Sequence, residues 1–130
     1  MNTSETFLTF NNGVLAVPNY TKKFSAIPWT QHPVFEGVEL KHIVTGQDTD
    51  GQFSYHLVRI APNKSILNHI HEKQLETHEV IGGFGTCVNS GQTIPYQSGT
   101  LSIMPAGIEH AVIAGEDGLC LFAKFFPALS

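Results

Sequence analysis

Basic residues are scarce in this chain of 130 residues, and arginine is almost absent. Lysine and arginine together number seven, Arg59 is the single arginine, and the formal net charge is −4 at pH 7. A protein that binds nucleic acid or an acidic membrane surface neutralises phosphates with clustered Lys and Arg side chains. We therefore expect no nucleic acid and no membrane among the partners of this protein.

Long apolar runs are also missing. No stretch approaches the roughly 20 apolar residues of a membrane-spanning helix, and the first residues lack the basic and apolar segments of a secretory signal. We therefore expect a cytoplasmic protein.

The chain has only two cysteines, Cys87 and Cys120. They are too few and too far apart for a zinc module or a disulfide framework. Each stands in an apolar stretch, where a reduced thiol packs as a small hydrophobic group. Both are predicted to be buried thiols.

Apolar residues are plentiful, at 42% of the chain, and charged residues make up 14%. This length and composition predict one domain over residues 1–130 with a single core. Residues 1–34, which are broken by prolines, are expected to form an N-terminal arm or edge strands, packed against the barrel or a partner subunit. Residues 35–126 are expected to form the barrel.

Short runs of Val, Ile, Phe and Thr alternate with turn residues from Phe35 onward, and no convincing helix is visible. This pattern predicts an all-β fold of antiparallel strands, a sandwich or closed barrel with little or no helix. The glycine-rich segments 82–85 and 115–118 are interpreted as loops. The expected strands are residues 38–44, 52–60, 66–71, 76–81, 86–89, 93–96, 101–104, 110–114 and 119–126.

His69 and His71 are separated by one residue in an expected strand. Side chains alternate along a strand, so both imidazoles point the same way, about 6.6 Å apart, and both can reach one metal ion. A tight turn through residues 72–75 could return the chain antiparallel and place Glu76 beside them. His110, after the turn Pro105-Ala106-Gly107, offers a fourth ligand.

Imidazole and carboxylate ligands together suit one divalent transition metal, namely Fe, Mn, Ni, Co, Cu or Zn, whereas calcium and magnesium prefer oxygen. A lone His-x-His is often only a surface or core pair. Its combination with Glu76 and with the Pro-x-Gly-x-x-His phrase that ends at His110 makes a metal site the stronger interpretation.

Two motifs resemble those of the cupins. The first cupin motif is Gly, five residues, His-x-His, three or four residues, Glu, six residues and Gly, and the chain has His69-x-His71, four residues, Glu76, six residues and Gly83. The second is Gly, five residues, Pro-x-Gly, two residues, His, three residues and Asn. The chain matches it with Gly99, Pro105-x-Gly107 and His110.

Asn63 and Ala114 replace the first glycine and the final asparagine of these motifs. Neither is a ligand position, so the departures affect turn geometry and packing more than the site. The sequence is similar to small single-domain cupins of the RmlC-like superfamily and the cupin 2 conserved-barrel family. The resemblance implies a double-stranded β-helix, that is a jelly-roll barrel, with a metal held by His69, His71, Glu76 and His110, and a homodimer.

His78 has the strand parity of Glu76 and is expected to face the barrel interior, either in the pocket, where it could orient a ligand or transfer a proton, or as simple packing. His32, His42 and His56 lie outside the motifs and are interpreted as surface or satisfied core residues.

Three imidazoles and one carboxylate leave two positions of an octahedral ion open. We expect a metal-dependent enzyme acting on a small neutral or monoanionic organic molecule, because the basic residues are too scattered to bind phosphates. An oxygenase of the dioxygenase type is the first choice, before an isomerase, lyase or decarboxylase. The alternatives are a non-catalytic metal-dependent module that binds or senses a small ligand, and a structural or storage barrel whose metal only staples the strands.

Overall fold

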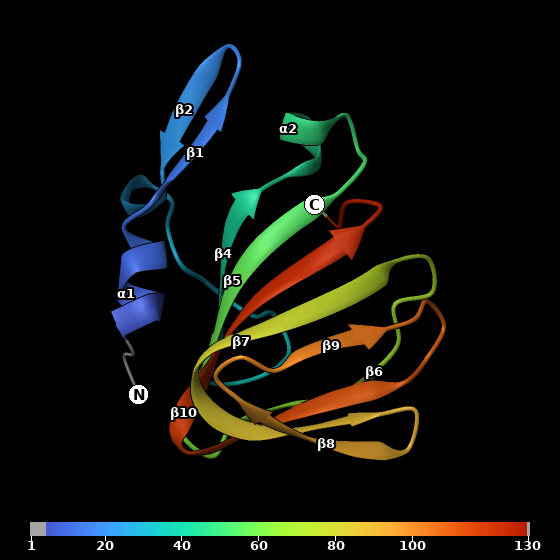
Figure 1. Cartoon of the computed structure of the whole chain (residues 1–130). Helices are drawn as coiled ribbons and strands as arrows, with labels where there is room; N and C mark the ends of the chain where they lie inside the picture. Colours follow the sequence, from blue (N-terminus) through green and yellow to red (C-terminus); the bar gives the residue numbers. More distant parts are fainter. Residues whose placement is uncertain (1–4, 130) are drawn as a thin grey trace.

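The structure is a computed structural model that describes residues 5–129. Most of these residues lie in antiparallel strands, so the predicted all-β class is confirmed (Figure 1). The elements, in chain order, are α1 (Glu5–Asn11), β1 (Val14–Val17), β2 (Tyr20–Lys23), the 3-10 helix η1 (Phe24–Ala26), β3 (Thr30–Gln31), β4 (Val38–Val44), α2 (Gly46–Thr49), β5 (Ser54–Ile60), β6 (Ser65–His69), β7 (Leu75–Asn89), β8 (Gln92–Gln97), β9 (Leu101–Met104) and β10 (His110–Phe126).

The helices are short, and sequence patterning had not indicated them. α1 lies in the N-terminal segment, and α2 is one turn inside the loop between β4 and β5. α2 forms because Thr45 and Asp48 make a capping box, in which the Thr45 backbone N–H donates to the Asp48 carboxylate at 2.9 Å. A polar loop thus becomes helical through local hydrogen bonds without any apolar periodicity.

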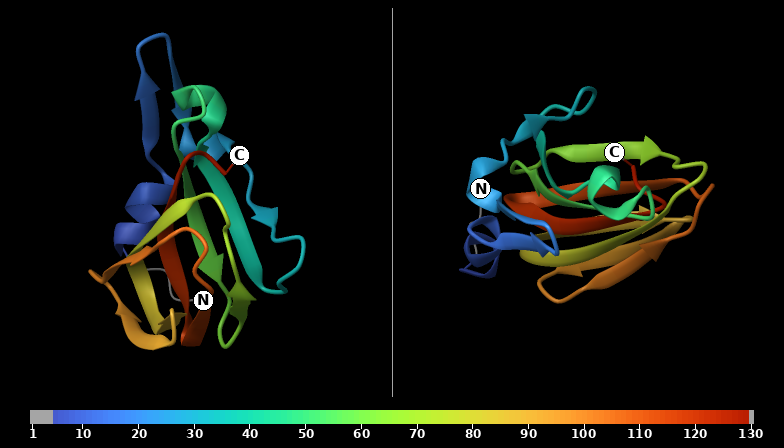
Figure 2. Two further views of the ribbon diagram at one scale, coloured as in Figure 1. Left: turned by 90° about the vertical axis from the view of Figure 1, so that its right-hand side faces the viewer. Right: turned by 90° about the horizontal axis from the view of Figure 1, so that it is seen from above.

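Two long strands build both layers of the barrel. The first part of β7 pairs with β9 and with the last part of β10, whereas its second part pairs with β8 and with the first part of β10. β10 also pairs with β6 through its first part and with β5 through its last part. One layer is therefore β3-β4-β5-β10-β7-β9 and the other is β6-β10-β7-β8. Figures 1 and 2 show the sheet folded over on itself.

The glycine-rich segments 82–85 and 115–118 lie inside β7 and β10, so the prediction that they are loops between separate strands is wrong. They are the bends at which each strand passes from one layer to the other, and the β7–β10 register shifts there. Gly83 has φ +76°, and a Cβ atom added to it would lie 2.2 Å from the carbonyl oxygen of Gly118. Only glycine allows the two strands to approach so closely.

β6 and β7 are not neighbours, which corrects the predicted hairpin through residues 72–75. β6 pairs with the start of β10, and Glu76 in β7 lies between Phe125 of β10 and Met104 of β9. The connection therefore crosses from one layer to the other. The crossing still brings Glu76 to the histidines, because both layers face the same interior.

Both faces of the β4-β5-β10 region are covered, and two apolar clusters result. Val58, Val80 and Leu121 belong to the cluster inside the barrel, where the buried thiol of Cys87 also lies. A second cluster on the outer face is made by residues of β4, β5, β7 and β10, including Cys120, together with Phe7 of α1 and Phe24 of η1. Both cysteines are buried thiols outside any disulfide, as predicted, and burial raises the pKa of Cys120 to about 11.

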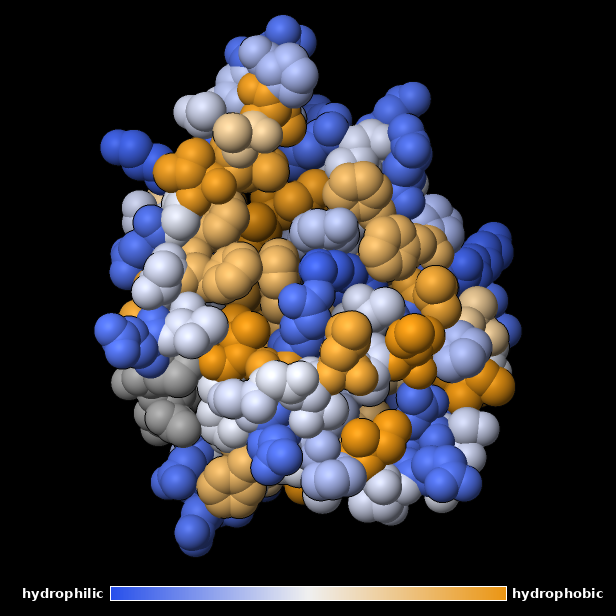
Figure 3. All heavy atoms as spheres, viewed as in Figure 1, coloured by the Kyte–Doolittle hydropathy of each residue, from blue (hydrophilic) through white to orange (hydrophobic). Residues whose placement is uncertain are grey.

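The β1–β2 hairpin projects beside this outer face, and Lys22 of β2 pairs with Asp48 of α2 at 2.7 Å. An apolar hollow of about 390 Å³ lies between the hairpin and the outer face, and it is lined partly by β1 and by Tyr55 and Phe122. Figure 3 shows the apolar side chains gathered on this face. Within residues 5–129, no helix is long and apolar enough to span a membrane.

Candidate metal centre and ligand pocket

The four residues predicted as metal ligands meet inside the barrel. His69 ends β6, His71 follows two residues later, Glu76 lies near the start of β7, and His110 begins β10. One ligand atom from each lies within 4.8 Å of the others. Strands far apart in the sequence thus bring three imidazoles and one carboxylate to a common point.

Backbone carbonyls orient two of the imidazoles. His69 Nδ1 lies 2.9 Å from the carbonyl oxygen of Leu67, and His110 Nδ1 lies 3.2 Å from that of Ile108. A carbonyl oxygen only accepts, so each Nδ1 carries the proton and donates it. In the neutral form of each ring, Nε2 then keeps its lone pair, which is the form that binds a metal ion. Burial alone would lower the pKa of His110, but the Glu76 carboxylate outweighs burial and raises it, so a metal ion would compete with a proton at this ring.

The centre of the cluster contains two polar atoms that the described residues do not satisfy. Glu76 Oε1 lies 3.0 Å from His110 Nε2 and 3.4 Å from His71 Nε2. Glu76 and His110 are 4% and 2% exposed, yet Oε1 and Nε2 lack a hydrogen-bond partner among residues 5–129. Buried polar atoms without partners are costly. A cation among them would satisfy both, so the residues fit a metal site.

Glu76 is held as a carboxylate. Burial alone would raise its pKa, but the nearby imidazoles of His78 and His110 outweigh burial and hold the pKa well below its usual range. Burial lowers the pKa of His69 and His71, which favours their neutral, ligating forms.

His78 contacts the Glu76 carboxylate on the side that faces away from the histidines of the cluster. Its Nε2 lies 2.6 Å from Glu76 Oε2, and its Nδ1 lies 2.8 Å from the hydroxyl of Tyr96, which is in turn hydrogen-bonded to Ser102. The imidazole Nε2–H therefore donates to Oε2 and leaves Oε1 facing the cluster. This places His78 in contact with the predicted ligand set, on the interior side that its strand parity indicated.

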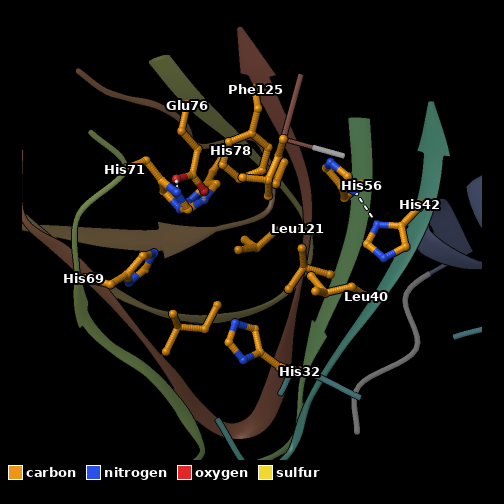
Figure 4. Close-up of a pocket in the computed structure, with 14 residues that line it drawn as sticks. His32, Leu40, His42, His56, His69, His71, Glu76, His78, Leu121 and Phe125 are labelled. Carbon is orange, nitrogen blue, oxygen red and sulfur yellow. Dashed lines mark hydrogen bonds and ion pairs between the residues drawn. The ribbon is translucent and has the colours of Figure 1, made fainter. Parts of the chain in front are cut away.

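A pocket of about 100 Å³ adjoins the cluster (Figure 4). His69, His71, Glu76 and His78 form part of its wall, and Leu40, Val58 and Leu121 are among its apolar residues. Ala123 also lines it and pairs across the sheet with His56 on one side and His78 on the other. The small side chain of Ala123 leaves space between the two imidazoles.

The pocket also includes His32, His42 and His56, so all seven histidines of the chain lie in the cluster or in this wall. Sequence reasoning interpreted these three as surface or core residues. His56 is buried and hydrogen-bonded, as a core residue should be, but its side chain faces the pocket. The concentration of histidine in one site becomes visible only when the strands are assembled.

His42 and His56 form a hydrogen-bonded pair on the β4–β5 wall. Their Nδ1 atoms are 2.8 Å apart, and His56 Nε2 lies 2.9 Å from the hydroxyl oxygen of Ser54, which accepts from the backbone N–H of Leu129 at 2.8 Å. Burial and the neighbouring His42 lower the pKa of His56 to about 4. Burial also lowers the pKa of His42. Both rings are therefore neutral at neutral pH.

The hydrogen bonds of His32 have the opposite direction to those of His69 and His110. Its Nδ1 accepts hydrogen bonds from the backbone N–H groups of Val34 at 3.0 Å and Phe35 at 3.2 Å. Burial and the nearby His69 lower its pKa. Nδ1 therefore carries no proton, and the proton of the neutral ring is on Nε2.

Asn63, which replaces the first glycine of the motif, has φ +61°. This left-handed conformation is the one in which glycine is common and asparagine is tolerated. The departure from the motif thus preserves the turn before β6.

Comparison with known proteins places this geometry in a family. The family model described as a cupin domain matches residues 56–123, just over half of the chain. No curated protein matches the sequence.

Three solved structures are similar at low sequence identity. A predicted oxalate decarboxylase from Thermotoga maritima has a TM-score of 0.73 and 20% identity, covering 79% of this chain and 95% of its own. KdgF from Halomonas sp. has a TM-score of 0.68 and 18% identity, covering 77% and 86%. An RmlC-like cupin from Shewanella frigidimarina has a TM-score of 0.70 and 13% identity, covering 82% and 88%. At these identities the likeness shows the fold.

Proposed function

Because this chain belongs to the cupin family, we propose that it is a metal-dependent enzyme acting on a small neutral or monoanionic organic molecule. The observation that carries the proposal is the position of the His69, His71, Glu76 and His110 cluster against a small pocket. A bound divalent transition metal would act as a Lewis acid toward an oxygen of the ligand and would offer two open coordination positions.

The residues of this chain would perform the remaining tasks. His78 holds the Glu76 carboxylate by its Oε2 atom, so that Oε1 faces the metal position. The His42–His56 pair provides neutral imidazoles that could accept or donate a proton. The apolar walls exclude water and favour a ligand with few charges.

The distribution of positive charge supports a ligand with little negative charge. In the part of the chain that the structure describes, no Lys or Arg lines the pocket. Arg59, the single arginine, pairs with Glu39 at 2.9 Å, and its guanidinium lies 4.0 Å from the ring centre of Trp29. A phosphorylated or multiply carboxylated substrate would need basic groups that the pocket lacks.

The test is conversion of a panel of compounds by protein loaded separately with Fe²⁺, Mn²⁺, Ni²⁺, Co²⁺, Cu²⁺ and Zn²⁺. The panel contains short hydroxy acids, oxo acids, 1,2-diols, diketones and thiols, and products are followed by NMR with and without dioxygen. We expect turnover above free metal by the wild type and none by His110→Ala, which removes one ligand.

The dioxygen arm separates the reaction classes. Dioxygen consumption coupled to product identifies the oxygenase that the two open positions favour, whereas product formed without dioxygen identifies a lyase, isomerase or decarboxylase. Ligand-dependent stabilisation without product from any compound would contradict an enzyme and support a binding module.

A further inference from the structure

We propose that His32 is a ligand-recognition residue, which donates a hydrogen bond from Nε2 to an oxygen on the part of the ligand that lies away from the metal. This inference rests on the proposed function, because the ligand occupies the same pocket. It assigns to the ligand two oxygen functions, one for the metal and one for His32.

The ring of His32 is held in a single orientation. Its Nδ1 receives two backbone N–H groups, its own backbone N–H donates to Val38 O at 2.8 Å, and the Phe35 ring lies against it with centroids 4.8 Å apart. An Nδ1 that accepts cannot donate, so Nε2–H is the donor of this ring. A donor fixed before binding loses little entropy when the ligand arrives.

A purely structural role would not call for histidine. An acceptor that caps the N–H groups two and three residues ahead needs only a short side chain, such as Asn or Asp. The imidazole reaches further, and His32 lines the same pocket as His69 and Glu76. Figure 4 places His32 across the pocket from Glu76. The ring therefore joins the loop to the pocket, and its second nitrogen is available to a ligand.

The residues between the two polar sides define the ligand class. Leu40, Val58 and Leu121 line the pocket along with His32 and the cluster. A ligand with an oxygen at each end and a short aliphatic segment between them would match these surfaces. We infer that the ligand is a short hydroxy or oxo acid, with its carboxylate on the metal and its hydroxyl or carbonyl oxygen on His32.

The test compares His32→Asn with His32→Gln. The Asn side chain keeps an acceptor near the position of Nδ1 and removes the Nε2 donor, whereas the Gln side chain places an N–H group near the position of Nε2. The probes are straight-chain carboxylates of three to six carbons and the matching acids with a terminal hydroxyl. Binding to Co²⁺-loaded protein is measured by calorimetry, and Co²⁺ affinity is measured separately from the visible spectrum.

At one chain length, we expect the hydroxy acid to bind wild type about fivefold to tenfold more tightly than the plain acid, as for one neutral hydrogen bond. His32→Asn should lose this preference with unchanged Co²⁺ affinity and melting temperature, and His32→Gln should recover part of it. A preference that survives in His32→Asn, or its absence from the wild type at every length, would overturn the proposal.

A failure of the proposed function can be distinguished from a failure of the His32 proposal. If the wild type does not bind Co²⁺, the metal site is wrong, and His32 is then tested by ¹⁵N NMR of the metal-free protein. We expect His32 at pH 7 to be neutral and protonated on Nε2. Protonation on Nδ1 would overturn the assignment of His32 whatever the result for the metal.

Discussion

His42 Nδ1 and His56 Nδ1 face each other at 2.8 Å across the β4–β5 pair. One ring must donate and the other accept, so the contact is incompatible with a proton on both Nδ1 atoms. A fully charged pair would lose the hydrogen bond and place two like charges in contact inside the barrel. The neutral pair is therefore part of what the folded state stabilises.

This relationship predicts an acid-dependent loss of stability. Burial first, and then His42, lower the pKa of His56 from 6.5 to about 4, so between these pH values the unfolded chain binds a proton that the folded protein does not. The unfolding free energy is therefore unaffected by protonation of His56 above pH 6.5 and decreases as the pH falls from 6.5 toward 4. We expect His56→Gln to remove about 2 kcal/mol of the decrease in unfolding free energy between pH 7 and pH 5.

Urea denaturation of metal-free wild type and variant at both pH values measures this difference. An equal decrease in the two proteins would contradict the neutral pair.

Removal of one ligand should abolish stabilisation by metal. A metal ion at 100 times its dissociation constant adds about 2.7 kcal/mol to the unfolding free energy, or about 10 °C in melting temperature for a chain of this size. We expect this rise in the wild type and in His42→Gln, which keeps the cluster intact, but not in His110→Ala. Scanning calorimetry with and without Co²⁺ measures it. An unchanged rise in His110→Ala would exclude His110 as a ligand.

Filling the pocket should separate ligand binding from metal binding. Ala123 is 2% exposed and lies between His56 and His78, outside the ligand set. We expect Ala123→Val to occupy part of the pocket of about 100 Å³ and to weaken binding of the short hydroxy acids at least tenfold. Co²⁺ affinity should stay within about twofold of wild type, since no ligand moves. Unaltered binding of these acids would show that the ligand does not enter this space.

The strand bend can be tested with two glycines of similar conformation. Gly83 and Gly91 have φ values of +76° and +79°, but a Cβ atom would lie 2.2 Å from the Gly118 carbonyl oxygen at the first position and would contact nothing within 4 Å at the second. We expect Gly91→Ala to cost about 1 kcal/mol through backbone strain. Gly83→Ala should cost about 3 kcal/mol or more, because the two strands must also separate.

Chemical denaturation of both variants gives the comparison. Equal costs would mean that the close approach of β7 and β10 contributes little.

Much of the site followed from local spacing. The His-x-His spacing predicted that His69 and His71 reach one point, which they do, although β6 ends at His69 and the predicted strand over residues 66–71 is too long. Strand parity put His78 on the side of Glu76, and the motif around Pro105 and Gly107 identified His110. Strand propensity and turn residues were sufficient for the antiparallel class. These features depend on residues near one another in the chain, where covalent geometry limits the choices.

The pairing of strands that are distant in the chain could not be predicted from the sequence in this way. The glycines of segments 82–85 and 115–118 resemble loop residues, and only the crossing of β7 and β10 makes them bends within continuous strands. The pairing of β6 with β10 rather than β7, and the convergence of His32, His42 and His56 on one pocket, have the same origin. Strand register and layer order are set by packing between segments distant in sequence. The hydrophobic pattern within one segment therefore does not reveal which distant strand it pairs with.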